Sequence, residues 1–253
     1  MTTTARTPAR KGAQRAPMTS LRKTALLVGV LFVITYITAI ASKFALYPPL
    51  LESADYIVGG SGNDTQVLWG ALSEVILVLA NIGTAVALFP VLKRQHEGLA
   101  LGYVTARVTE CVFIGVGILS VLTIVTLRQD FSGAGDADSA ALLTVGHALV
   151  TLQEWTFLLG PGFVVGVGNG LILGYLLYRS GLVPRGMAVL GLVGGPLICV
   201  SGAAVLLGFI EAGSAWQLTA SIPEFFWELS LGVYLIGKGF KPSPVTVGMV
   251  DES

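Results

Sequence analysis

Residues 99–127 form one long apolar run, LALGYVTARVTECVFIGVGILSVLTIVTL, which constrains the fold more than any other stretch. About 20 apolar residues suffice to cross the hydrocarbon core of a bilayer, so the run predicts a membrane-spanning helix. Arg107 and Glu110 lie well inside it. Ionisable groups at that depth are costly unless other helices supply partners. The run therefore predicts a bundle of several spans with a polar interior.

The composition agrees with a membrane protein. Hydrophobic residues make up 53% of the 253 residues and charged residues only 12%, whereas a soluble domain carries about 25% charged residues. The mean hydropathy of +0.78 leaves too few polar side chains for a water-facing shell. We therefore expect an all-α, polytopic helical membrane bundle whose principal partner is the lipid bilayer.

The chain begins with a basic segment, residues 1–22, that has no periodicity and no acidic residue. We expect a disordered tail. Beside an apolar run, such a tail marks the cytoplasmic side rather than a nucleic-acid partner. Residues 24–42 form the first predicted span. A signal peptide cleaved after Ala41 is the alternative, but the apolar run is longer than a usual signal segment, which favours an uncleaved span.

Further spans are predicted from apolar runs bounded by polar turns. Residues 43–66 and 128–139 read as loops. Gly160, Pro161 and Gly162 are predicted to divide the segment 140–178, which is too long for one span. The part before this break is amphipathic, because Thr144, His147, Thr151 and Glu154 recur at helical spacing. The spans after the first are predicted over residues 67–92, 99–127, 161–178, 186–210 and 216–236.

The positive-inside rule decides how to count the amphipathic segment 140–159. If it crossed the bilayer, there would be seven spans and more basic residues outside than inside. If it stays at the outer surface or re-enters, six spans place eight basic residues inside and only Lys43 and Arg128 outside. We therefore predict a membrane domain over residues 23–240 with six spans and an outer amphipathic helix. Both termini are expected to be cytoplasmic, and residues 241–253 to form a short polar tail.

Six polar residues from four predicted spans share one depth near the middle of the bilayer, counting ~1.5 Å per residue from the nearest basic end. Each is costly against lipid, so they are expected to turn inward together. Arg107 offers a fork of donors that suits a carboxylate. The six residues are Asn81, Arg107, Glu110, Asn169, Glu224 and Glu228.

This polar layer holds three acids and one arginine. Either one or two of the acids bind a proton, or the site admits water or a cation. Two interpretations remain open: a buried ion-pair network that sets the register of the helices, or a functional site.

A second, outer polar group comprises Glu74, His147 and Glu154, for which acids in interfacial water are the alternative interpretation. Cys111 and Cys199 lie in apolar segments and give no disulfide framework. The two histidines, His96 and His147, are far apart in sequence, so we expect no metal site and no cofactor.

Several sequence motifs resemble those of a bacterial family of uncharacterised membrane proteins, domain-of-unknown-function family 4386. They are ALFPVLKRQHEGLALGYVTARVTE (87–110), LGPGF (159–163), GYLLYRSGLVPR (174–185) and PEFFWELSLGVYLIGKGF (223–240). The resemblance covers about residues 21–240. It implies a multi-pass protein of the bacterial cytoplasmic (inner) membrane and no assigned activity.

Three functions fit these observations. The first is transport of a small solute, or proton-coupled transport, which the polar layer favours; six spans are few for a transporter, so a homodimer is expected. The second is an intramembrane enzyme acting on lipid, which lacks a His-rich motif or a Ser/His or Cys/His pair at one depth. The third is a non-catalytic membrane subunit or sensor that binds a partner protein. The balance is against an enzyme.

Overall fold

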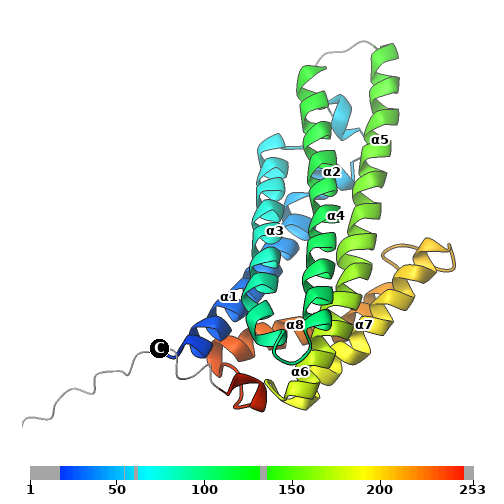
Figure 1. The fold of residues 1–253 in the computed structure, drawn as a ribbon. Helices are drawn as coiled ribbons and strands as arrows, with labels where there is room; N and C mark the ends of the chain where they lie inside the picture. Colours follow the sequence, from blue (N-terminus) through cyan, green and yellow to red (C-terminus); the bar gives the residue numbers. More distant parts are fainter. Residues whose placement is uncertain (1–17, 54, 60–61, 132–135, 248–253) are drawn as a thin grey trace, which may run out of the picture.

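The computed structural model describes residues 18–53, 55–59, 62–131 and 136–247, and all regular structure in these ranges is helical (Figure 1). Most of the predicted basic tail and the last part of the predicted polar tail lie outside the described residues. The long elements are α1 (Ser20–Ile40), α3 (Asp64–Leu92), α4 (Glu97–Asp130), α5 (Asp136–Leu159), α7 (Arg185–Leu206) and α8 (Ala215–Gly237). The shorter ones are η1 (Ala41–Leu46), α2 (Pro48–Leu51), η2 (Tyr56–Val58), η3 (Gly160–Val164), η4 (Gly166–Leu173), α6 (Gly174–Ser180) and η5 (Pro244–Thr246).

The helices begin at residues that can accept a hydrogen bond from the first turn. The Asn63 side chain accepts from the backbone N–H of Thr65 at 2.9 Å and starts α3. His96 Nδ1 accepts from the N–H of Leu99 at 3.1 Å and starts α4. These contacts satisfy donors that a helix N-terminus otherwise leaves free. At the other end of a helix, Gly181 adopts a positive φ of 67°, which ends α6 in a tight turn.

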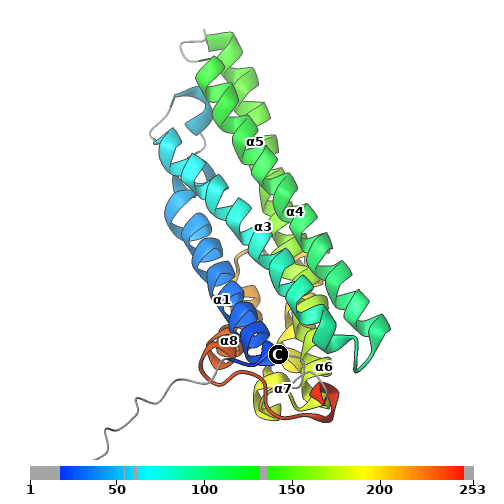
Figure 2. The ribbon, with the colours of Figure 1, turned by 60° about the vertical axis from the view of Figure 1, so that its left-hand side comes forward.

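The helices form a bundle in which sequence neighbours pack against one another. α1 packs on α3 and α8, α4 lies between α3 and α5, and α7 contacts both α8 and η4. Gly29 of α1 and Gly232 of α8 face each other so closely that a Cβ on Gly29 would lie 2.7 Å from the Gly232 carbonyl oxygen. Figures 1 and 2 both show α4 and α5 side by side and extending beyond α7.

One end of the bundle gathers the start of α1, the turns before α4 and α7, and the end of α8 (Figure 1). Arg22 Nη1 donates to the carbonyl oxygen of Leu235 at 2.8 Å. The backbone N–H of Lys241 donates to the carbonyl oxygen of Leu182 at 2.8 Å. We call this the basic end. It holds the eight basic residues that the sequence places on one side: Arg22, Lys23, Lys93, Arg94, Arg179, Arg185, Lys238 and Lys241.

The predicted break at Gly160, Pro161 and Gly162 is wrong. The chain stays helical from Asp136 to Ser180 and passes through the π-helical segments η3 and η4. Pro161 cannot donate a backbone hydrogen bond, and the wider π turns let the helix continue past it without that bond. Close packing holds the segment in place, because a Cβ on Gly160 would lie only 2.7 Å from Phe113 Cβ.

The predicted outer helix is therefore the far half of one long helix and not a separate surface element. α5 packs along α4, and Ser120 Oγ donates to the carbonyl oxygen of Leu149 at 2.6 Å. Thr144, His147, Thr151 and Glu154 are exposed along it. The apolar stretch Ser139–Ser180 has 42 residues. At 1.5 Å per residue it is roughly 63 Å long, about twice the thickness of a hydrocarbon core.

Five helical stretches of the described chain are long and apolar enough to cross a membrane: Ser20–Leu46, Asp64–Leu92, Glu97–Asp130, Ser139–Ser180 and Arg185–Leu206. The predicted class of polytopic helical bundle thus holds, while the count of six spans and one separate helix is not confirmed. The predicted sixth span coincides with α8, which is absent from this group. The helix α8 is continuous, but Glu224 and Glu228 interrupt its apolar sequence, and Gln217 lies in its first turn.

Apolar cores lie on either side of the middle of the bundle. Near the basic end, Phe32, Tyr103 and Trp227 are buried in one cluster. At the far end, Tyr47 and Tyr56 belong to another, which packs η2 against α4 and α5 and includes Leu50 of α2. The segment 43–66, predicted to be a loop, thus contributes to a core, and its first residues extend α1 through η1.

Candidate functional site

The buried ring formed by Arg107, Glu110 and Asn81 joins α3 to α4. Arg107 Nη1 donates to Glu110 Oε2 at 2.8 Å, and Arg107 Nη2 donates to Asn81 Oδ1 at 2.5 Å. Asn81 Nδ2 then donates to Glu110 Oε1 at 3.0 Å and closes the ring. All three residues are buried, with exposures of 2%, 4% and 1% in the order given. The charge of Arg107 is therefore balanced within this ring.

Asn169 and Glu228 form a separate polar pair between η4 and α8. Asn169 Nδ2 donates to Glu228 Oε1, and Trp227 Nε1 donates to the backbone oxygen of Asn169 at 3.0 Å. The π-helical turn of η4 carries Asn169, and such turns often occur at functional sites. Glu228 remains partly exposed, whereas Asn169 is completely buried.

Glu224 lies one turn before Glu228 and is only 3% exposed. Neither of its carboxyl oxygens has a hydrogen-bond partner among the described residues. The carboxyl group sits against backbone, since a Cβ on either Gly170 or Gly194 would lie 2.8 Å from Glu224 Oε2. These glycines also bring η4 and α7 together, because a Cβ on Gly170 would lie 2.4 Å from the Cα atom of Gly195.

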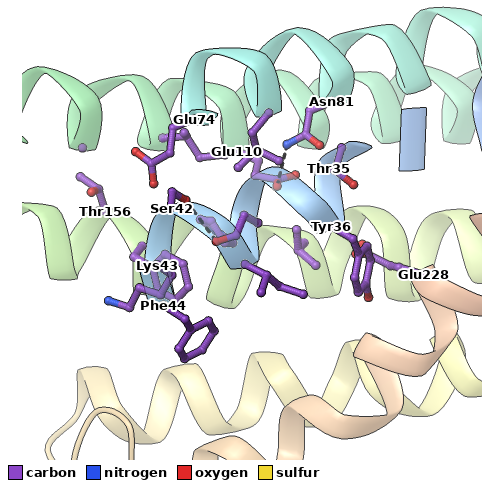
Figure 3. A pocket seen from close by; sticks show the side chains of 18 of the residues that line it. Thr35, Tyr36, Ser42, Lys43, Phe44, Glu74, Asn81, Glu110, Thr156 and Glu228 are labelled. Atoms are coloured by element: carbon purple, nitrogen blue, oxygen red, sulfur yellow. Dashed lines mark hydrogen bonds between the residues drawn. The ribbon is translucent and has the colours of Figure 1, made fainter. Parts of the chain in front are cut away.

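A cavity of about 250 Å³ lies in the bundle beside the polar ring (Figure 3). Asn81, Arg107, Glu110 and Glu228 line one side of it. Glu224 and Asn169 are not among its lining residues; Asn169 is bonded to Glu228, and Glu224 lies one turn before Glu228 on α8. The structure thus brings four of the six predicted polar residues to one cavity and places the other two next to it.

The predicted outer group does not form one cluster. Glu74 is buried, lines the same cavity and accepts a hydrogen bond from Tyr47 Oη at 2.8 Å. Glu154 and His147 are exposed on α5, and His147 lines a separate, smaller pocket. Lys43 lines the cavity on the same side as Glu74 (Figure 3).

Sequence reasoning missed Lys43, Tyr36 and Tyr47 as members of the site. Tyr36, Ala39 and Lys43 line the cavity from successive turns of one helix face. That helical spacing was readable in the sequence, but Pro48 and Pro49 suggested a loop that began too early. Figure 3 shows Lys43 and Glu74 toward one side of the cavity and Tyr36 and Glu228 toward the other.

Metal-site chemistry finds no support in the part of the chain that the structure describes, which contains no group of three His, Cys, Asp or Glu side chains able to hold an ion. Both cysteines are free thiols, and Cys111 Sγ lies 3.7 Å from the carbonyl oxygen of Val78. What the site offers is charge, hydrogen bonds and a cavity.

Comparison with known proteins gives one match. The family model "Domain of unknown function (DUF4386)" matches residues 27–239, a range that includes every residue of the cavity and of the polar groups around it. No curated protein and no solved structure matches the chain.

Proposed function

Because the chain belongs to the DUF4386 family, a domain of unknown function, we propose its function from the site: it is a multi-pass membrane protein that moves a small solute through the bundle cavity in exchange for protons. The observation that carries this proposal is the cavity of about 250 Å³, which is lined by a buried arginine and three glutamate side chains. A network that only sets helix register needs no such space.

The proposal places the protein in the bacterial cytoplasmic membrane with the basic end inside. Eight basic residues at one end against Lys43 and Arg128 toward the other favour this orientation. Both termini are then cytoplasmic. α8 is the sixth span, because it runs back to the basic end in contact with α1 and α7. A transporter of this size is expected to work as a homodimer.

Glu224 and Glu228 are the proton-binding groups in this proposal. An ionised carboxylate that is buried among glycines without a partner is costly, so Glu224 is expected to be protonated. Glu228 lies one turn further along α8 and lines the cavity, so it can exchange a proton with a solute or water inside the cavity. Glu110 is instead held by Arg107 and Asn81.

Transport also requires the cavity to open toward each side in turn. The cluster that contains Phe32, Tyr103 and Trp227 closes the bundle at the basic end. Because this cluster fills that end, α1 or α8 must move before the cavity can open toward the cytoplasm.

Proteoliposomes with an internal pH dye test the proposal. Addition of transported solutes should drive proton movement through the wild-type protein, and Glu228→Gln should abolish it. Glu211→Gln is the matched control, because Glu211 is an exposed glutamate between α7 and α8 and is not part of the cavity lining. Equal proton movement in the wild type and in Glu228→Gln would contradict the proposal.

A further inference from the structure

We propose that the cavity binds a monovalent organic cation with an apolar body, which enters sideways from the outer leaflet and places its charge between Glu228 and Tyr36. This names the substrate class of the proposed transporter and rests on that function only for the transport step. Binding itself needs nothing beyond the cavity.

The charges that line the cavity favour a cation. Five charged side chains contribute: two basic ones, Lys43 and Arg107, and three acidic ones, Glu74, Glu110 and Glu228. Arg107 is bonded to Glu110 at 2.8 Å, and Lys43 lies on the same side of the cavity as Glu74 (Figure 3). The carboxyl group of Glu228 then remains, with a neutral amide as its hydrogen-bond partner. Complementary charge therefore selects cations and rejects anions.

An aromatic ring stands beside this carboxyl group. Tyr36 Oη donates to the carbonyl oxygen of Phe225 at 2.5 Å, and the Tyr36 and Phe225 rings meet edge to face with centroids 5.1 Å apart. Phe225 precedes Glu228 by one turn of α8, and Figure 3 shows Tyr36 and Glu228 toward the same side of the cavity. A carboxylate together with an aromatic ring is a favourable setting for an ammonium group.

The same cavity already accommodates one ammonium group on an aromatic ring. Lys43 Nζ lies 4.8 Å from the centroid of the Phe157 ring, and both residues line the cavity. Lys43 occupies the Phe157 ring, so a ligand cation is left with the Tyr36 ring on the Glu228 side of the cavity.

The rim of the cavity is apolar. Ile40, Phe44, Phe157 and Phe225 line it and expose 45%, 74%, 39% and 42% of their surface. They come from three separate elements: the end of α1 with η1, α5, and α8. Along α1, Tyr36 is ~21 Å and Phe44 ~33 Å from Arg22 at 1.5 Å per residue, so the rim faces the outer leaflet. A ligand that enters there must tolerate hydrocarbon, which requires an apolar body.

Binding to the full-length protein in lipid nanodiscs tests this inference. The probe is benzyltrimethylammonium; neopentylbenzene is its neutral isostere, and phenylmethanesulfonate is an anion of similar shape. The wild-type protein should bind the cation saturably, the isostere at least ~tenfold more weakly, as for loss of a charged contact, and the anion not at all. This comparison needs no variant and is independent of any folding defect.

Variants then locate the cation. Glu228→Gln and Tyr36→Leu should each weaken binding of benzyltrimethylammonium by about tenfold. Tyr36→Phe should retain binding because it keeps the ring, and Glu211→Gln, at an exposed glutamate outside the cavity lining, should leave it unchanged. Equal affinity for the cation and its neutral isostere would overturn the inference and indicate a cavity filled by lipid chains. Unchanged affinity in Glu228→Gln would overturn it as well.

The outcomes separate this inference from the proposed function. Charge-selective binding without proton-coupled uptake in proteoliposomes would support the cation site and overturn transport. Proton-coupled uptake of a neutral or anionic solute, with no binding of the cation probe, would support transport and overturn the cation site.

Discussion

Among the individual residues, Arg107 has the most demanding environment. It is a buried cation, and two of its guanidinium nitrogens are held by Glu110 and Asn81. Its Nε atom has no hydrogen-bond partner within the described residues. Removal of one member of a buried ion pair is generally worse than replacement of both, because it leaves a charge without compensation.

Arg107→Ala should therefore destabilise the protein strongly, by roughly 3–5 kcal/mol, measured as a lower melting temperature in detergent. The double change Arg107→Met with Glu110→Gln should recover much of the loss. Arg94→Ala is a suitable control, since Arg94 is an exposed arginine bonded to the Val247 carbonyl oxygen at 3.2 Å. Unchanged melting of Arg107→Ala would show that the ring does not stabilise the fold.

Glu224 should respond in the opposite way. Its carboxyl oxygens accept no hydrogen bond from the described residues, so Glu224→Gln removes a potential charge without breaking a contact. We expect the variant to melt at or above the wild-type temperature and to lose proton exchange in proteoliposomes. A marked drop in melting temperature would instead indicate that the ionised carboxylate is part of the fold.

At the scale of elements, the glycines of η4 and α7 control how closely the two helices approach. Gly170→Ala would place a Cβ 2.4 Å from the Cα of Gly195, so the backbones must separate. We expect a lower melting temperature and an altered cavity, because Glu224 is held in the same contact. Gly115→Ala on α4 is the matched control, since a Cβ there meets nothing within 4 Å. The control should be neutral or stabilising, by up to about 1 kcal/mol, because alanine is the better helix former. Equal melting of both variants would contradict this account.

The long helix from Asp136 to Ser180 shows why helix-breaking residues must be weighed against tertiary packing. Gly160, Pro161 and Gly162 weaken helical hydrogen bonding, and in isolation they favour a break. Contacts on Phe113 and on α7 instead hold the segment in π turns. The result places Asn169 opposite Glu228.

At the scale of the whole molecule, the bundle has two unlike ends. The basic end is closed by an apolar cluster, while α4 and α5 project from the far end together with α2 and η2 (Figures 1 and 2). Because α4 and α5 are longer than a hydrocarbon core is thick, we expect the projecting part to lie outside it.

Cysteine labelling in whole cells checks this orientation. In a background with Cys111 and Cys199 replaced, cysteines at Thr65 and Thr144 should react with an impermeant reagent from outside. Cysteines at Glu97 and Gly186 should react only after permeabilisation. All four positions are exposed, so protection reflects the membrane and not burial. External labelling at Gly186 would reverse the assignment of the basic end.

The sequence by itself determined the class of protein, the family, the approximate limits of most long helices and the side on which the basic residues gather. These follow from local composition and from the constant rise of a helix, which also placed Arg107, Glu110 and Asn81 at one depth. The match to the DUF4386 model agrees with the family resemblance.

Only the tertiary structure decided which groups pair and where space remains. Spacing along the chain allowed Arg107 to pair with any of three acids. In the structure, Arg107 donates to Glu110, and Asn169 donates to Glu228. It also turned Lys43 into the cavity and kept residues 160–162 helical. The physical reason is that the rotation of each helix about its axis depends on contacts between helices. Close glycine contacts set that rotation here, and no periodicity within a single segment contains it.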